Sequence, residues 1–156
     1  AALFHMPGIT PEASHIDIPD GWFEVERVDL EAAAASLNDA DPAEIDFASL
    51  GCPHLSLSEI AHLAEQLKDR QVKAEFWVTT SRPVKHIADR MGYTQLIEDS
   101  GAKFAVDTCC VVAPIRGRFK ALATDSAKAC FYASGKNRFK TLFGSFEEVV
   151  RAALKG

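Results

Sequence analysis

The 156-residue chain lacks the features that mark a membrane span, a nucleic-acid-binding surface or a secretory leader. No apolar run approaches the roughly 20 residues that a helix needs to cross a bilayer. The formal net charge is −5, whereas nucleic-acid-binding domains usually carry a basic surface. The first residues hold no basic region of a signal peptide, and no Met begins the chain. We therefore expect neither a membrane nor a nucleic-acid partner, and a piece of a longer cytoplasmic protein.

Several common site motifs are also absent. The sequence contains no phosphate-binding G-x-x-x-x-G-K-[ST], no dinucleotide-binding G-x-G-x-x-G and no nucleophile elbow G-x-S-x-G. Paired C-x-x-C elements of a zinc ribbon are missing too. The four cysteines are Cys52, Cys109, Cys110 and Cys130. Without a secretory signal, disulfides are the weaker interpretation. Reduced thiols, either buried as small apolar side chains or bound to a metal, are favoured.

Length and hydrophobic patterning favour one domain that covers residues 1–156, with 1–21 as an irregular, turn-rich lead-in. Strands are predicted at 24–28, 44–50, 73–79, 103–106, 120–124 and 139–143. Helices are predicted at 29–37, 56–70, 81–91, 93–100, 126–133 and 145–154. Alternation of this kind predicts an α/β fold, a three-layer α/β/α arrangement around a mostly parallel sheet.

Polar and thiol groups follow several of the predicted strands. They are Cys52, Thr79 with Thr80, Cys109, the run 124–126, and Gly144 with Ser145. In parallel sheets ligands gather beyond the carboxyl ends of the strands. We therefore expect these groups to converge at one edge of the sheet.

Cys52 stands in a turn that suits a ligand. Gly51 permits a tight bend, Pro53 stiffens it, and Ser56 with Glu59 forms a capping box that starts a helix. A helix N-terminus lowers the pKa of a nearby thiol. The alternative is a buried thiol beside a surface histidine, His54, with Ser56 acting only as a cap.

Two further elements can contribute to a site. Cys109 and Cys110 are adjacent in an extended segment, so one thiol is expected to face the site and the other the core. A buried pair and a strained vicinal disulfide are the alternatives. Ser126 at a helix start and Lys128 just after it could hold a carboxylate or phosphate, or serve only as a cap and a solvated lysine.

Cysteines on separate loops suit an iron–sulfur cluster, whose iron can act as a Lewis acid on a substrate hydroxyl. Such a cluster calls for a third thiolate. Cys110 and Cys130 are poorly placed for that role, so we expect the third ligand outside this chain.

Five segments, in order, resemble signature elements of the aconitase X family. They are Gly8-Ile9-Thr10-Pro11-Glu12-Ala13, the run from Leu50 to Glu59, Asp107-Thr108-Cys109 with Val111-Val112-Ala113-Pro114, Thr124-Asp125-Ser126-Ala127-Lys128 with Tyr132, and Phe143-Gly144-Ser145-Phe146-Glu147-Glu148.

The resemblance implies an aconitase-like domain of a hydro-lyase that removes water from a hydroxy acid with the help of iron or an iron–sulfur cluster. It assigns metal binding to Cys52 and Cys109. It also implies that Thr10, His54, Ser56, Ser126 and Lys128 line the substrate site.

The substrates of this family are cis-3-hydroxy-L-proline, which we rank first, and mevalonate 5-phosphate. The chain is much shorter than the family's catalytic region. We expect the catalytic base to lie outside it, on a small swivelling domain or subunit that is its partner. A non-catalytic α/β binding module with structural thiols is the alternative from another class.

Overall fold

A parallel sheet organises the part of the chain that the computed structural model describes, residues 4–155. Within it lie five strands: β1 (Phe47–Leu50), β2 (Glu75–Thr80), β3 (Lys103–Val106), β4 (Ala121–Thr124) and β5 (Lys140–Phe143). All neighbouring strands pair in parallel, in the order β3-β2-β1-β4-β5. The predicted α/β class with a parallel sheet is thereby confirmed.

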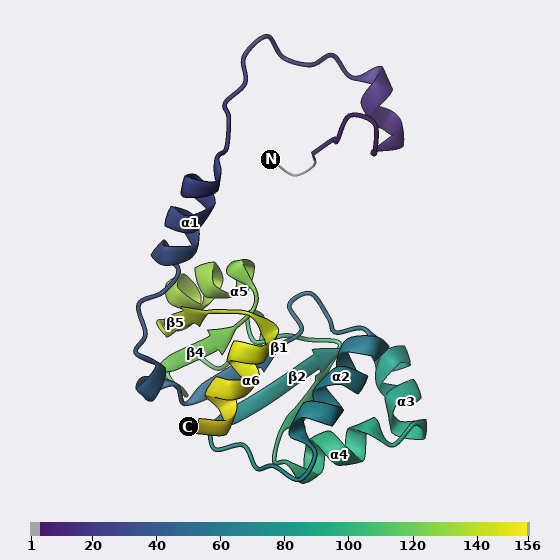
Figure 1. Ribbon diagram of the computed structural model, residues 1–156, viewed down its shortest axis with the longest axis vertical. Coiled ribbons are helices and arrows are strands. Elements are labelled where there is room, and N and C mark those ends of the chain that lie inside the picture. Colours follow the sequence, from purple (N-terminus) through teal and green to yellow (C-terminus); the bar gives the residue numbers. More distant parts are fainter. Residues whose placement is uncertain (1–3, 156) are drawn as a thin grey trace. The chain divides into compact units, whose positions relative to one another are not determined.

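Helices lie before, between and after the strands of residues 4–155, except between β3 and β4. They are α1 (Arg27–Ser36), α2 (Leu57–Leu67), α3 (Arg82–Arg90), α4 (Tyr93–Asp99), α5 (Ala127–Tyr132) and α6 (Phe146–Lys155). Shorter turns are η1 (Pro11–His15), η2 (Pro42–Glu44) and the π-helical η3 (Ala133–Asn137). Figure 1 shows α2 and α6 lying over β1 and β2.

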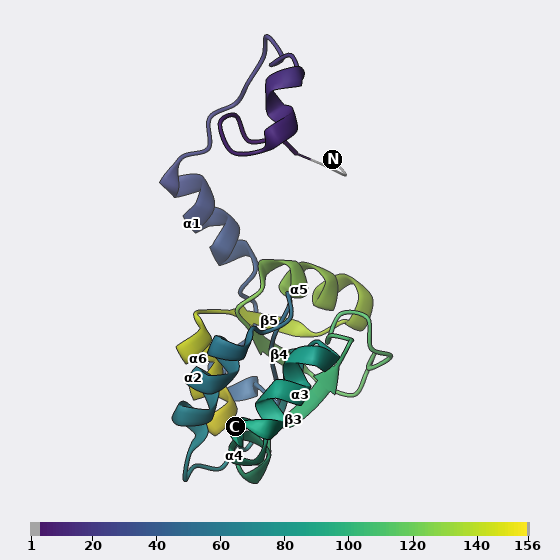
Figure 2. The same ribbon diagram turned by 90° about the vertical axis from the view of Figure 1, so that its right-hand side faces the viewer.

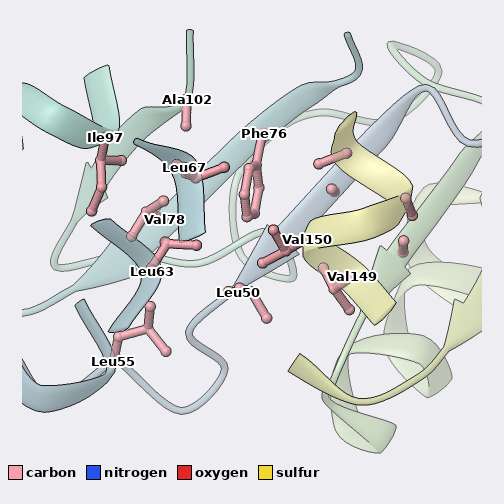
Figure 3. Close-up of a cluster of buried hydrophobic side chains, with 14 of the residues drawn as sticks. Leu50, Leu55, Leu63, Leu67, Phe76, Val78, Ile97, Ala102, Val149 and Val150 are labelled. Carbon is pink, nitrogen blue, oxygen red and sulfur yellow. The ribbon is translucent and has the colours of Figure 1, made fainter. Parts of the chain in front are cut away.

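One face of the sheet carries the larger core. Leu50 of β1 and Phe76 of β2 are fully buried against α2, α4 and α6 (Figure 3). The apolar stripe of α2, at Ile60, Leu63 and Leu67, has the three- and four-residue spacing of one helix face. This core holds the central strands in place, and with them the loops that follow.

The opposite face has a second core around Phe47. Its ring stacks on Phe119 at 4.4 Å and meets Trp77 edge to face at 5.3 Å. Ala129 of α5 and the segment between β3 and β4 complete this cluster. Figure 2 shows α2 and α6 at the left and the segment between β3 and β4 at the right. A long loop therefore covers part of this face in place of a helix.

Residues 4–30 form a separate unit, and 31–155 form the other. In the first unit the predicted strand at 24–28 is wrong, because the backbone there is irregular up to Glu26 and α1 begins at Arg27. The carboxylate of Asp29 accepts a hydrogen bond from the Glu26 amide at 2.9 Å. This local cap, followed by a run of alanines, favours helix over strand.

Among residues 4–155, none of the helices has the length and apolar character that a bilayer-spanning segment requires.

Candidate functional site

The strand order reverses between β1 and β4. From β1 the chain moves outward through β2 to β3 and then returns to β4 on the other side of β1. The carboxyl ends of such adjoining strands leave a crevice where ligands bind in open α/β sheets. Cys52 follows β1 and Ser126 follows β4. The fold thus places two of the predicted site residues on either side of this crevice.

The turn that carries Cys52 is held tightly against β2. Gly51 has φ of +108°, which only glycine adopts readily. The Thr79 hydroxyl donates to the Gly51 carbonyl at 2.5 Å, and the Leu55 amide donates to the Thr79 carbonyl at 3.0 Å. A Cβ at Gly51 would collide with the Thr79 carbonyl oxygen. The close approach fixes the direction in which Cys52 leaves the strand.

The loop that carries Cys109 is tied down from several elements. Asp107 has φ of +57°, and its carboxylate accepts from the Arg82 amide at 2.8 Å, at the start of α3. His54 Nε2–H donates to the Thr108 carbonyl at 2.9 Å. On the other side of Cys109, the Lys136 ammonium donates to the Val111 carbonyl at 2.9 Å.

These loops enclose a cleft of about 350 Å³. It is lined by Gly51, Cys52, Pro53, His54, Asp107, Thr108, Cys109, Val112 and Lys128. Both predicted metal ligands and two of the predicted substrate-binding residues therefore share one cavity.

Opposing effects act on the Cys52 thiol. Burial raises its pKa above the usual value, and the neighbouring Cys109 adds to the rise. A hydrogen bond from Ser126 and the positive charge of Lys128 act in the opposite direction. The Ser126 oxygen accepts from the Ala129 amide at 3.1 Å, so its single proton is free to point at sulfur. Burial thus favours the thiol form of Cys52, whereas Ser126 and Lys128 favour the thiolate.

The other two cysteines face the interior. Cys110 is 2% exposed and burial raises its pKa to about 12. Cys130 is 1% exposed and burial raises its pKa to about 11. The adjacent pair thus divides as the sequence predicted, with Cys109 at the cleft and Cys110 in the core. All four thiols are free.

Two other predicted substrate-binding residues, Ser56 and Thr10, have hydrogen-bond partners within their own segments. Ser56 caps α2, where its hydroxyl and backbone amide are both engaged with Glu59. Thr10 belongs to the unit of residues 4–30, where its hydroxyl oxygen accepts from the Met6 amide at 2.9 Å. Ser56 does not line the cleft, and the roles of Ser56 and Thr10 in substrate binding stay predictions.

The cleft holds two thiols, Cys52 and Cys109. Within residues 4–155 no group of three or more His, Cys, Asp or Glu side chains is arranged to hold a metal ion. Two thiols that share one cleft, beside a hydroxyl and an ammonium group, fit part of an iron–sulfur ligand set. A cluster at this position would need at least one ligand from outside residues 4–155.

Sequence reasoning named Thr79 and Asp107 near the site but did not predict that they hold the two loops, and it missed Asn137. Asn137 is 2% exposed and donates to the Cys110 carbonyl at 3.4 Å. A polar residue at the end of a strand, as at Thr79, or directly after one, as at Asp107, was the available signal. No local pattern marks Asn137, because its partner lies 27 residues away.

A larger cavity, about 560 Å³, lies beside α5. It is lined by Ser36, Leu37, Asp39, Cys130, Phe131, Tyr132, Ser134, Gly135, Lys136 and Thr141. Only one thiol borders it, and none of the predicted site residues does. The smaller cleft is therefore the better candidate for chemistry.

The fold and the cleft define a class: a parallel α/β domain with a pair of thiols at the point where its strand order reverses. Residues 45–155 match the family model described as the aconitase X third domain. The chain belongs to the aconitase X family.

Known relatives are longer proteins. The phosphomevalonate dehydratase large subunit of Methanocaldococcus jannaschii is 38% identical over 154 residues, which cover 96% of this chain and 38% of that protein. The one from Thermococcus kodakarensis is 42% identical over 135 residues, 84% of this chain and 34% of that protein. The cis-3-hydroxy-L-proline dehydratase of Hypocrea jecorina is 31% identical over 168 residues, all of this chain and 28% of that protein.

A solved structure also supports membership of the aconitase X family. The crystal structure of Thermococcus kodakaraensis aconitase X in its holo-form matches with a TM-score of 0.79 and 37% identity. The match covers 94% of this chain and 38% of that one. The chain therefore spans less than two-fifths of the length of these relatives.

Proposed function

We propose that this chain is one domain of a carbon–oxygen hydro-lyase that removes water from a hydroxy acid, and that Cys52 and Cys109 hold its iron–sulfur cluster. The observation that carries the proposal is the shared cleft: thiols from two separate loops meet beside Ser126 and Lys128. The names of the relatives, which are dehydratases, support the reaction class.

The cluster would supply Lewis-acid assistance to the departure of the substrate hydroxyl. The residues of this chain would bind the cluster and the substrate. Cys52 and Cys109 would bind as thiolates, and Ser126 would keep donating to the Cys52 sulfur. Lys128, exposed at the rim, would attract the acidic end of the substrate. His54, Ser56 and Thr10 would take part in substrate binding, as the family resemblance implies.

Two substrates are candidates. The first is cis-3-hydroxy-L-proline, and a dehydratase named for it aligns over the whole chain. The second is mevalonate 5-phosphate, which the higher identities support: 38% and 42% to two phosphomevalonate dehydratase large subunits, against 31% and 32% to two hydroxyproline dehydratases. Lys128 suits either substrate, since each carries an anionic group.

The proposed enzyme needs more than this chain. No carboxylate or histidine of the cleft is assigned as the base, which we place on a small swivelling domain or a separate subunit. Several relatives are named large subunits, which supports a partner. We place the complete enzyme in the cytoplasm.

The test is a dehydration assay on the full-length protein, combined with its small subunit and prepared without oxygen. Both candidate substrates are offered to wild type, Cys52→Ser, Cys109→Ser and the matched control Cys110→Ala. The proposal predicts turnover of one substrate, its loss in the two serine variants, and its retention in the control. Full activity in Cys52→Ser and Cys109→Ser would contradict it. A protein without activity toward either substrate would favour the non-catalytic binding module.

A further inference from the structure

The two loops that carry the cleft thiols are joined by one side chain. His54 lies two residues after Cys52 and donates from Nε2 to the carbonyl oxygen of Thr108, the residue before Cys109, at 2.9 Å. The two bonded residues are 54 positions apart in sequence. A carbonyl oxygen can only accept, so Nε2 must carry the proton.

The loop around Cys109 is bonded to three other parts of the fold. Asp107, which directly follows β3, accepts from the amide of Arg82, the first residue of α3, at 2.8 Å. Lys136 and Asn137 of η3 donate to the carbonyls of Val111 and Cys110. These contacts fix the loop to α3 and η3. His54 alone among these partners belongs to the Cys52 loop.

We infer that His54 is a positioning residue: its hydrogen bond to Thr108 sets the Cys109 thiol at the correct distance from Cys52 for both to bind one cluster. The inference rests on the proposed function. It differs from the sequence expectation, which places His54 against the substrate. Groups that orient metal ligands typically contribute 10–100-fold to metal affinity, so the loss of this bond should be measurable.

Two substitutions of His54 distinguish a kept hydrogen bond from a broken one. The amide nitrogen of Gln reaches about as far as Nε2 of His, so His54→Gln can keep the bond to Thr108. The shorter Asn cannot reach, so His54→Asn breaks it. His86→Asn is the control, because His86 is an exposed histidine on α3 that does not line the cleft.

The full-length protein with its small subunit is loaded with iron and sulfide, and the visible absorbance is followed after an iron chelator is added. We expect His54→Asn to lose absorbance roughly 10–100-fold faster than wild type. In His54→Gln and His86→Asn, the rate of absorbance loss should stay within about threefold of wild type. Equal rates for His54→Asn and wild type would overturn the inference. Equally fast loss in both His54 variants would overturn it as well.

A second readout needs no cluster. In the iron-free full-length protein, backbone amide exchange across residues 108–113 should be faster in His54→Asn than in wild type or His54→Gln, while exchange in β1 and β4 stays unchanged. Unchanged exchange in that loop would contradict the inference, and faster exchange throughout would show a folding defect that rules out a local positioning role. If the wild-type protein binds no iron at all, the proposed function itself fails, which is a separate outcome.

Discussion

Replacing Gly51 by alanine should destabilise the domain and displace Cys52. The added Cβ would collide with the Thr79 carbonyl oxygen and lie 2.5 Å from the Thr79 hydroxyl oxygen. Backbone strain at a φ of +108° costs about 1–3 kcal/mol, and overpacking costs about 1–3 kcal/mol more. The free energy of unfolding should therefore fall by about 2–6 kcal/mol, the sum of these two costs.

Urea unfolding followed by circular dichroism measures this loss, with Gly135→Ala as the control. A Cβ at Gly135 meets no atom within 4 Å, so that variant should stay within about 0.5 kcal/mol of wild type. The melting temperature of Gly51→Ala should drop by at least about 4 °C, given the usual 2–4 °C per kcal/mol. If Gly51→Ala unfolds at the same urea concentration as wild type, the close packing of this turn on β2 is wrong.

Three further predictions concern single side chains. Asp46→Ala removes the carboxylate that accepts from the amides of Lys120 and Ala121, at the start of β4, at 3.0 Å. Its loss should lower the free energy of unfolding by about 2–4 kcal/mol in urea titrations. The exposed Asp20→Ala is its control, and an equal effect of both would refute the role of these bonds. Lys128→Gln should raise the KM of the full-length enzyme roughly tenfold with kcat nearly unchanged, since it removes charge attraction from binding; a changed kcat at constant KM would refute this. Burial raises the pKa of Cys110 from 9.0 to about 12, so the folded state keeps its proton where the unfolded chain loses it. Stability should therefore fall as pH rises from about 9 toward 12, and Cys110→Ala should flatten this slope; an unchanged slope would assign the effect to other groups.

Local patterns predicted the elements well and their long-range partners poorly. The capping box of Ser56 and Glu59 and the α/β alternation follow from spacing and propensity, and both are present. The placement of Cys52 and Cys109 at strand ends was sufficient to expect convergence, because parallel strands share one edge. The predicted strand at 24–28 failed because a local cap at Asp29 outweighs short alternation.

The contacts that shape the cleft could not be read from the sequence. The bond from His54 to Thr108, and the contact of Ser126 with Cys52, depend on how the segment between β3 and β4 returns across the sheet. That path is set by Phe119 stacking on Phe47, a contact across 72 positions of sequence. Periodicity within one element carries no information about such pairs.

The central claim is that Cys52 and Cys109 hold iron. The most direct measurement is the iron and acid-labile sulfide content of the full-length protein, purified without oxygen, in wild type, Cys52→Ser, Cys109→Ser and the control Cys110→Ala. The account predicts iron and sulfide in wild type and in Cys110→Ala, and a loss of both in each serine variant. Undiminished iron in Cys52→Ser and Cys109→Ser would contradict it.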